Sequence, residues 1–539
     1  MSSAGNNVAA AAALVPPADA LAWKSPVSPW LISLTVMLAT FMEVLDTSIA
    51  NVSLPNIAGN LSAGIDESTW VLTSYLVSNA IILPLAGWFA SLFGRKRFFM
   101  ICVGVFVVSS FLCGFAPSLR WLVIFRILQG AGGGSMQPLA QAILVESFPK
   151  EKRGMGMAVY AMGVVVAPIV GPTVGGWITD NYSWRWIFFI NIPIGALSLL
   201  MTSMLIHEPP YLHRRKFGTF RIDWLGLGLL SVGLGALQIV LDKGQREDWL
   251  ASHMIVSLMV VSGVCLLGGF LWELRQKEPV VDVHLLKERN FLIAVIIMFV
   301  LGIVLYGSTA ILPIFMQTLL GYTAMLSGLV LSPGGLFTLL MLPLVGKLLG
   351  RFEARWLVIV GILAVSTSLV MMSRYSIYVD FWSPAIARMV QGVGLAFLFV
   401  PINTMAFYFV AKERTNYASG LINLARNIGG SVGIAGVATL LARNSQIHQA
   451  NLVGNLNPYS DAFRVAQQQA TALMTARGYA PVVADQAGAG MLYGLMSRQA
   501  AMLAFVDIFQ ILAVALFVMI PLTFLMKRVK PGGGPSLAH

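Results

Sequence analysis

Six ionisable side chains of this 539-residue chain fall inside long apolar stretches, where a charge is costly. They are Glu43, Asp46, Arg126, Arg388, Arg426 and Asp507. A charged side chain in a bilayer needs a partner, so each of these residues is a hypothesis for a functional site. The chemistry open to carboxylates and guanidinium groups at such depth is ion pairing, proton transfer and the binding of charged substrates.

Glu43 and Asp46 are three residues apart, so they share one face of a helix. At about 1.5 Å of rise per residue, Asp46 lies about 12 Å, Glu43 about 16 Å and Arg126 about 9 Å from the outer ends of their stretches. Asp46 and Arg126 therefore have compatible depths and can pair if their helices touch. Such a pair either loads and releases a proton in each transport cycle, with Arg126 moving relative to Asp46, or it is a static buried ion pair. Glu43 is either a proton carrier or a contact for a cationic substrate.

The two other arginines have less obvious partners. Arg388 has no acidic residue opposite it and is either a packing residue or part of a functional site. Arg426 could pair with Asp507, but the helical rise puts them about 22 Å and about 12 Å from the outer face, which favours an anionic group as the partner of Arg426. We place Glu43, Gln129, Arg388 and Arg426 in a candidate substrate-binding set.

Other kinds of chemistry find little support. The six histidines lie in loops or at the ends of apolar stretches without metal-ligand spacing, and the chain has no Gly-x-x-x-x-Gly-Lys-Ser/Thr loop for ATP. Cys102, Cys113 and Cys265 lie in apolar stretches, which is typical of small core residues. We therefore expect no enzyme, no metal site and no cofactor other than a proton gradient.

The elements that must position these residues are membrane-spanning helices. The chain is 57% apolar and 11% charged, against roughly 45 to 50% and about 25% in soluble domains, which excludes a soluble enzyme. Apolar runs long enough to cross a bilayer recur between short polar breaks. Fourteen such spans are predicted, at about 30–53, 69–91, 98–116, 120–144, 155–178, 186–206, 224–241, 253–273, 291–316, 325–346, 356–373, 383–410, 417–440 and 499–526. The expected fold class is an all-α membrane protein.

The distribution of basic residues orients these spans. With the N-terminus in the cytoplasm, 23 Lys and Arg residues fall on the inner side and 9 on the outer side. The positive-inside rule then places both termini in the cytoplasm. The net charge of +12 is thus a signal of orientation, which excludes nucleic acid as a partner and leaves the lipid bilayer. Residues 1–29 have no signal-peptide pattern and are expected to form a cytoplasmic tail.

An internal repeat organises the spans into two halves. Residues 126–132 and 388–394 share the pattern Arg-x-x-Gln-Gly-x-Gly at an offset of 262, and the first and ninth spans start 261 residues apart. This predicts two six-helix bundles in parallel repeat, at 30–206 and 291–526, with a linker at 207–290 that carries two inserted helices, and a tail at 527–539. The ninth span has no acid, so we favour a proton role for Asp46, because a purely architectural pair would more plausibly be duplicated.

Four motifs in order resemble the major facilitator superfamily, specifically its fourteen-span drug:proton antiporter branch, the EmrB/QacA family. They are Leu45 to Pro55 in the first span, Arg126-x-x-Gln129-Gly130 in the fourth, Ala167 to Gly176 in the fifth and Trp184 to Gly195 at the sixth. The resemblance covers essentially the whole chain. It implies that the first and fourth helices touch and that the two halves move by alternating access.

The fifth span carries Pro168, Gly171, Pro172, Gly175 and Gly176. The prolines bend a helix, and glycines four residues apart allow another helix to approach closely. The resemblance implies an antiporter motif at the interface of the halves, where a bend seals the outer side against proton leak. Ordinary close packing is the alternative.

The cytoplasmic end of the second span resembles the loop motif of the superfamily through Gly87, Gly94, Arg95 and Lys96. It departs from that motif at Ser91 and Leu92, where an acid and an arginine are usual. A charge latch between the halves is therefore in doubt, and we favour the basic run as a cluster that sets topology.

Residues 441–498 form the one sizeable outer loop, with a helix predicted at 462–476 and a second helical run after Pro481. The loop is either a passive cap or a docking site. The loop and the Gly-rich tail are most like EmrB-type members, which implies a periplasmic membrane fusion adaptor (EmrA-like) and an outer-membrane channel (TolC-like) as partners.

Together these observations predict an exporter in the bacterial inner membrane that exchanges protons for small hydrophobic or amphipathic compounds, as part of a tripartite pump. The alternatives are a proton-coupled exporter of one metabolite or fatty acid that acts alone, and a passive facilitator. The acids in the first span and the fifth-span motif argue against a facilitator.

Overall fold

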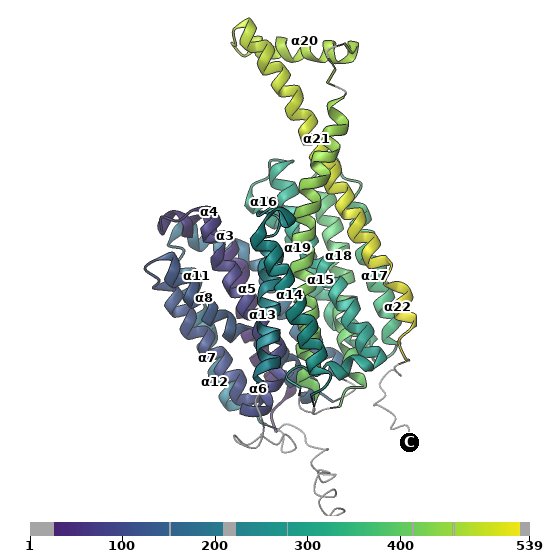
Figure 1. Ribbon diagram of the computed structural model, residues 1–539. Coiled ribbons are helices and arrows are strands. Elements are labelled where there is room, and N and C mark those ends of the chain that lie inside the picture. Colours follow the sequence, from purple (N-terminus) through teal and green to yellow (C-terminus); the bar gives the residue numbers. More distant parts are fainter. Residues whose placement is uncertain are drawn as a thin grey trace, which may run out of the picture.

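A computed structural model describes residues 26–149, 152–208, 223–276, 279–411, 414–454, 456–457 and 459–528. Most of the predicted N-terminal tail, residues 209–222 of the linker and most of the C-terminal tail lie outside these ranges. The regular elements of the described chain are helices, arranged as a long bundle with a projection at one end (Figure 1). We call the end of the bundle at the C-terminus the inner end and the opposite end the outer end.

The first half of the chain forms the first six predicted spans. They are α3 (Pro29–Asn60), α5 (Trp70–Ile82) continued by η1 (Leu83–Leu85) and α6 (Ala86–Phe93), α7 (Arg95–Gly114), α8 (Leu119–Gly133) with α9 (Met136–Ser147), α10 (Arg153–Asn181), and α11 (Trp186–Phe189) with α12 (Asn191–Leu205). A short helix, α4 (Ile65–Ser68), joins α3 to α5 at the outer end.

The inserted pair is α13 (Trp224–Lys243) and α14 (His253–Glu273). The second half consists of α15 (Arg289–Thr318), α16 (Ala324–Leu348), α17 (Ala354–Met372), α18 (Trp382–Tyr408), α19 (Thr415–Val453), α20 (Asp461–Ala476), α21 (Pro481–Phe517) and α22 (Ile520–Phe524). Short 3-10 helices lie at Trp249–Ala251 (η3) and Val283–Lys287 (η4).

Each of the fourteen predicted spans coincides with one helix or with two or three consecutive helical elements. Twelve helices of the described chain are long and apolar enough to cross a bilayer. The two other predicted spans are the fourth, which is interrupted at Gly134 and Ser135 between α8 and α9, and the fifth, α10, whose apolar part is short. The multi-pass helical prediction is confirmed, while the number fourteen stays a prediction.

The same pairs of helices pack together in both halves. In the first half α3 packs on α10, and α8 packs on α5 and α7. In the second half α15 packs on α19, and α18 packs on α16 and α17, which are the counterparts by repeat position. The parallel repeat seen at an offset of about 262 residues is therefore a repeat of structure as well.

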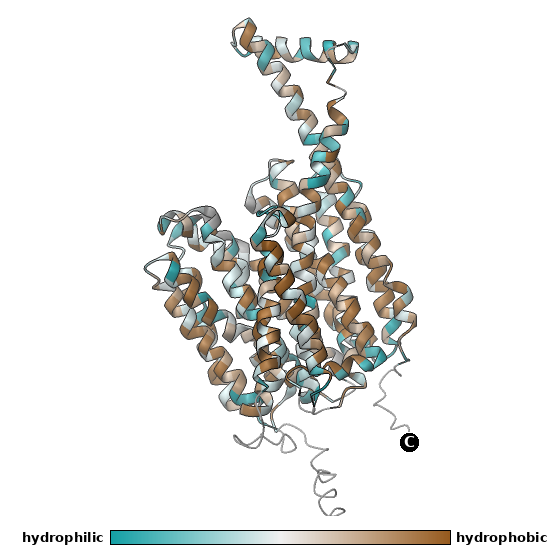
Figure 2. Ribbon diagram, in the orientation of Figure 1, coloured by the Kyte–Doolittle hydropathy of each residue, from teal (hydrophilic) through white to brown (hydrophobic). Residues whose placement is uncertain are grey.

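The two halves meet along two sets of helices. On one side α10 packs on α16 and α18; on the other, α19 packs on α6, η1 and α9, and α13 lies against both α5 and α19. Apolar residues cover the sides of the bundle and polar ones gather at its ends, as a bilayer requires (Figure 2). Val264 and Leu267 of α14 are about two-thirds exposed, which fits contact with lipid.

The outer loop of the second half is a helical projection. At about 1.5 Å per residue the 39-residue α19 and the 37-residue α21 are each about 55 to 60 Å long, well beyond a hydrocarbon core of about 30 Å. The two helices extend beyond the outer end of the bundle and carry α20 across their tips (Figure 1). The helices predicted at 462–476 and after Pro481 are present as α20 and the first part of α21. The helix at 441–453 was not predicted, and it is the continuation of α19 beyond its span.

Candidate proton and substrate site

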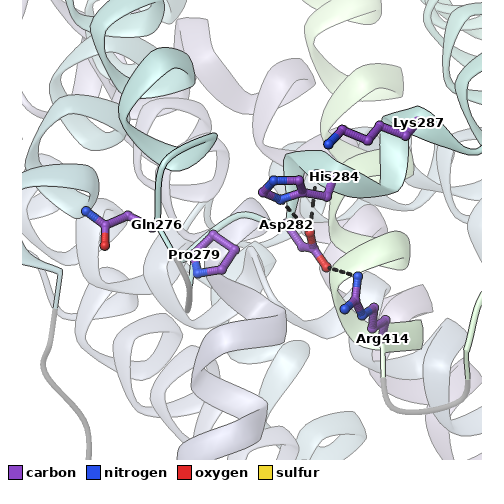
Figure 3. A pocket seen from close by; sticks show the side chains of 6 residues that line it. All are labelled: Gln276, Pro279, Asp282, His284, Lys287 and Arg414. Carbon is purple, nitrogen blue, oxygen red and sulfur yellow. Dashed lines mark hydrogen bonds and ion pairs between the residues drawn. The ribbon is translucent and has the colours of Figure 1, made fainter.

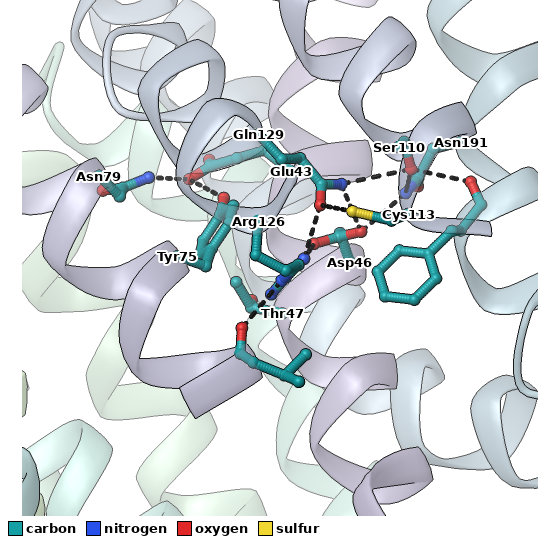
Figure 4. Close-up of polar contacts among 12 residues, drawn as sticks. Glu43, Asp46, Thr47, Tyr75, Asn79, Ser110, Cys113, Arg126, Gln129 and Asn191 are labelled. Carbon is teal, nitrogen blue, oxygen red and sulfur yellow. Dashed lines mark hydrogen bonds and ion pairs between the residues drawn. The ribbon is translucent and has the colours of Figure 1, made fainter. Parts of the chain in front are cut away.

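Asp46 lies in α3 and contacts Arg126 of α8 inside the first half (Figure 4). Asp46 Oδ2 accepts a hydrogen bond from Arg126 Nη1 at 2.5 Å, and Asp46 Oδ1 accepts from Gln129 Nε2 and Asn191 Nδ2 at 2.8 Å each. The side chains of Asp46 and Arg126 are 1% and 0% exposed. The pairing expected from their depths is confirmed.

Arg126 is held in place from several sides. Its Nε donates to the backbone oxygen of Val71 at 3.0 Å, its Nη1 also donates to Gln129, and its guanidinium lies 4.3 Å from the ring centroid of Tyr75. A buried charge without such compensation is strongly destabilising. Both oxygens of the carboxylate and the Nε and Nη1 of the guanidinium are thus hydrogen-bonded in this arrangement, so moving either group has a free-energy cost.

Ser110 of α7 connects the amides around Asp46. Its hydroxyl accepts from Asn191 at 2.9 Å and from Gln129 at 3.2 Å, and donates to the backbone oxygen of Phe188 at 2.9 Å. The carboxylate of Asp46 is therefore surrounded by donors from α8 and α12 that are themselves fixed by α7 and α11.

Glu43, one turn earlier on α3, is buried in a second network. Gln137 Nε2 donates to its Oε2 at 2.6 Å, while Asn79 Nδ2 and the Tyr75 hydroxyl donate to its Oε1 at 3.2 Å and 3.5 Å. Within the described residues, no lysine or arginine forms an ion pair with Glu43. The two acids of α3 therefore differ: Asp46 has a cationic partner, whereas Glu43 has only neutral donors.

Gln137 of α9 links Glu43 to the second half. Its Oε1 accepts hydrogen bonds from Arg426 of α19 and, at 3.3 Å, from the Tyr160 hydroxyl. One turn further along α9, Gln141 Oε1 accepts from Ser419 at 2.8 Å and from Asn423 at 2.7 Å. Two glutamines four residues apart thus form a polar contact line between α9 and α19.

Arg426 is buried without a carboxylate partner in the described chain. Asp507 of α21 instead accepts from His448 Nε2 at 2.7 Å and from Asn444 at 3.1 Å, both on the outer part of α19. The doubt about an Arg426 and Asp507 pair, based on their depths, is therefore correct.

Arg388 repeats the position of Arg126 but not its partner. It donates to Gln391 at 2.5 Å, and Gln391 Nε2 donates to the Ser308 hydroxyl of α15 at 2.9 Å. The offset of 262 residues places Ser308 at the position of Asp46. The second half thus keeps the arginine and glutamine and has a hydroxyl in place of the acid.

The glycines of the fifth span pack mainly within the first half. A Cβ at Gly171 would lie 2.4 Å from Ser48 Oγ, and one at Gly175 would lie 2.9 Å from Ile49, both on α3, whereas Gly176 has open space. Pro168 accepts a hydrogen bond from Ser48 at 3.4 Å, and Pro172 lies in the same helix. α10 does contact the second half, as the family resemblance implies, but Gly171 and Gly175 face α3.

The cytoplasmic loop motif contributes structural contacts. Gly94 has φ +83°, a conformation that favours glycine, between α6 and α7. Arg95 is buried and paired with Glu146 of α9, and Lys96 donates to the backbone oxygen of Ser203 at 2.6 Å. The ion pair of Arg95 ties α7 to α9, and the interpretation of the basic run as a cluster that sets topology stays a prediction.

Gly87 lies at a close approach between the two halves at the inner end. A Cβ there would lie 2.9 Å from the side chain and backbone of Tyr417 on α19. The contact between α6 and α19 therefore needs a residue without a side chain at this position.

A pocket of about 550 Å³ lies at the inner linker (Figure 3). It is lined by Gln276, Pro279, Asp282, His284, Lys287 and Arg414. Asp282 pairs with Arg414 at 3.2 Å and lies 3.6 Å from His284 Nδ1, so its charge is already matched. None of the predicted site residues lines this pocket.

Five polar residues that complete the two networks were not predicted from the sequence, namely Tyr75, Asn79, Ser110, Gln137 and Asn191. Each is a polar side chain within a predicted span or, for Asn191, within the sixth-span motif. A polar side chain in a span is a signal in itself, because in hydrocarbon it needs a hydrogen-bond partner. Only the packing of the helices shows which partner each one finds.

The Major Facilitator Superfamily model matches residues 36–434. The chain belongs to the major facilitator superfamily. The human organic anion transporter MFSD10 has the same fold, at a TM-score of 0.58 and 12% identity, over 90% of this chain and 99% of that one.

Within this superfamily, the chain is similar to multidrug exporters. It is 39% identical to the multidrug export protein EmrB of Haemophilus influenzae, over 80% of this chain and 84% of the relative. It is 37% identical to the fatty acid resistance protein FarB of Neisseria gonorrhoeae, over 96% and 98%, and 35% identical to EmrB of Escherichia coli K12, over 94% and 98%. The predicted resemblance to EmrB is confirmed, and the chain is a multi-pass membrane protein of a transporter superfamily.

Proposed function

We propose that this protein exports hydrophobic or amphipathic compounds in exchange for protons, by alternating access of its two halves. The observation that carries the proposal is the buried Asp46 and Arg126 pair, which joins α3 to α8 at 2.5 Å in the first half and has no acidic counterpart in the second. A charge pair in the membrane interior is costly, so its presence in only one half favours a role in proton coupling.

Asp46 and Glu43 of α3 have different roles in this proposal. Asp46 and Arg126 form a pair whose separation allows Asp46 to take up a proton, and the pair reforms when the proton leaves. Glu43 forms no ion pair within the described residues, and in this proposal it takes a proton or a cationic group of the substrate. Gln129, Arg388 and Arg426 are the further candidates for contact with the substrate, and of these Arg426 reaches across to Gln137 of the other half. The proposal involves no cofactor besides the proton gradient.

Export from proteoliposomes under an imposed pH gradient tests this function. Asp46→Asn keeps the shape of the side chain and removes its charge, so gradient-driven export should fall to background. Asp507→Asn, which changes a partly exposed acid of α21 bonded to His448, is the matched control and should keep it. Full export by Asp46→Asn would contradict the proposal.

Export of anionic amphipaths such as fatty acids is the second candidate. It is favoured by Arg426, a buried guanidinium whose contacts in the described chain are with neutral groups, and by the likeness to FarB. A panel of cationic, neutral and anionic compounds in the same assay separates the candidates. Export confined to anions, and lost in Arg426→Gln, would replace multidrug export by this narrower function.

We further propose that the protein lies in the bacterial inner membrane with both termini in the cytoplasm. The projection formed by α19, α20 and α21 would then stand in the periplasm and bind an EmrA-like adaptor that leads to a TolC-like channel. The excess of Lys and Arg at the inner end and the length of these helices support this arrangement. Fusion of a reporter that is active only in the cytoplasm to the C-terminus tests the orientation.

A further inference from the structure

In each of its three side-chain hydrogen bonds, the carboxylate of Glu43 is the acceptor. Gln137, Asn79 and Tyr75 each donate to its carboxylate, at 2.6, 3.2 and 3.5 Å. A carboxylate only accepts hydrogen bonds, whereas a protonated carboxyl group also donates one. When Glu43 binds a proton, at least one of these three partners must therefore accept a hydrogen bond, for which an amide has to turn round and a hydroxyl only has to redirect its hydrogen.

Gln137 forms the shortest of the three hydrogen bonds, and both the nitrogen and the oxygen of its amide are hydrogen-bonded. Its nitrogen faces Glu43, while its oxygen accepts from Arg426 of α19 and from Tyr160 of α10. If the amide turns so that its oxygen accepts from protonated Glu43, its NH₂ group faces the guanidinium of Arg426. Arginine has no acceptor, so the contact between α9 and α19 is lost.

Asn79 also connects Glu43 to α19, but its hydrogen bond to α19 can be kept when its amide turns. Its oxygen accepts from Asn427 Nδ2 of α19 at 3.4 Å. Asn427 is itself an amide and can turn to present its oxygen, so this contact adapts where the contact of Gln137 and Arg426 cannot. The charge of Glu43 is therefore transmitted to α19 mainly through Gln137.

We propose that Gln137 is a positioning residue that couples protonation of Glu43 to separation of the two halves at the inner end. The ionised acid holds the amide in the orientation that binds Arg426 and keeps α9 on α19. The protonated acid turns the amide and releases Arg426. This inference rests on the proposed proton coupling and adds the residue that connects the proton to the movement.

Other charged and titratable groups face the same region and must be considered in any pH dependence. They are Asp46 on α3, Tyr75 on α5, Arg126 on α8, Tyr160 on α10, Tyr306 on α15 and Arg426 on α19. Asp46 is the one other carboxyl group among them, and it is bonded to Arg126 and not to Gln137. Variants of Gln137 therefore separate the effect of Glu43 from that of Asp46.

Spin labels at the inner end report the movement. Arg97→Cys at the start of α7 and Arg351→Cys after α16 place labels at exposed positions of the two halves, in a chain whose three native cysteines are replaced by alanine. Distances between the labels are measured in lipid nanodiscs in acidic and alkaline buffer. The proposal requires the longer distances to gain population in acid, and Glu43→Gln to show them in both buffers.

Gln137→Met decides the proposal, because methionine fills a similar volume and cannot bridge Glu43 and Arg426. The distances in this variant should be the same in both buffers. Gln141→Met is the matched control: it weakens the contact of α9 with α19 one turn away but should keep the response to pH.

A normal pH response in Gln137→Met would overturn the proposal. If that response were lost in Tyr75→Phe, Tyr75 would be the group that accepts from protonated Glu43. Gradient-driven export by the unlabelled wild-type chain is measured in parallel. If wild type does not export in response to a proton gradient, the proposed function fails. If it does and Gln137→Met still responds to pH, the coupling role of Gln137 alone fails.

Discussion

Ser308 of α15 occupies in the second half the position that Asp46 of α3 occupies in the first. Each accepts a hydrogen bond from the glutamine that follows the buried arginine by three residues, at 2.9 Å from Gln391 and 2.8 Å from Gln129. The same framework of arginine and glutamine thus holds an acid in one half and a hydroxyl in the other. Under the proposed function this difference confines proton chemistry to the first half, which predicts that equivalent substitutions in the two halves have unequal effects.

Arg126→Gln and Arg388→Gln should therefore differ in transport. Arg126→Gln leaves Asp46 buried without its cation and should abolish gradient-driven export. Arg388→Gln removes a charge that contacts only neutral groups in the described chain and should keep at least part of it. Initial rates in proteoliposomes provide the measurement. Equal losses in the two variants would show that the acid next to Arg126 is irrelevant.

A double-mutant cycle should separate the stability of the Asp46 and Arg126 pair from its function. Removing one partner of a buried pair costs about 3 to 5 kcal/mol, so Arg126→Gln should lower the midpoint of thermal unfolding. Asp46→Asn combined with Arg126→Gln leaves no lone charge and should recover much of that loss, because the two changes are coupled. Export should stay absent in the double variant. A double variant no more stable than Arg126→Gln would argue against the pair as the cause.

Substitution of Gly171 should destabilise the first half, whereas substitution of Gly176 should not. A Cβ at Gly171 would lie 2.4 Å from Ser48 Oγ on α3, while Gly176 has open space. Overpacking a close contact costs about 1 to 3 kcal/mol, so Gly171→Val should unfold at lower temperature than wild type. Gly176→Val, measured in the same detergent, is the matched control. If both unfold like wild type, α10 and α3 are less closely packed than this structure shows.

The pair of Arg95 and Glu146 should contribute to folding rather than to transport. Arg95→Ala leaves Glu146 largely buried without its cation and should cost about 3 kcal/mol. Arg97→Ala, two residues on, removes an exposed charge and should change unfolding little. Fluorescence-monitored thermal unfolding of the purified variants checks both. A large effect of Arg97→Ala with none of Arg95→Ala would reverse this assignment.

Deletion of α20 should separate transport from assembly. Replacing residues 461–476 by a short flexible linker leaves the helices of the bundle intact, so export from proteoliposomes should match wild type. In cells that contain the adaptor, the same variant should no longer protect against exported compounds. Unchanged resistance in cells would identify α20 as a passive cap over the outer end.

Most of the fold could be predicted from the sequence because its signals are local. Apolar length, basic residues in the loops and the repeated pattern around Arg126 and Arg388 each depend on neighbours in the chain and on the bilayer, and they led to helices at the predicted places. The Asp46 and Arg126 pair followed from helical rise plus one assumption, that α3 and α8 touch. The break between α8 and α9 could not be predicted from the sequence. It lies at Gly134, where a Cβ would be 2.6 Å from the backbone oxygen of Asn79 on α5, a contact between helices far apart in the chain.

The sequence by itself determined that this is a membrane transporter with charged residues inside the spans of both halves, because the cost of a charge in hydrocarbon is set by residue type and depth. Only the tertiary structure decided how those charges are connected. Arg95 meets Glu146, and Glu43 reaches Arg426 through Gln137, across helices far apart in the chain. Hydropathy determines which segments form spanning helices, whereas close packing determines which helix faces meet. A hydrogen bond forms only when that packing brings donor and acceptor to the right distance within a few tenths of an ångström.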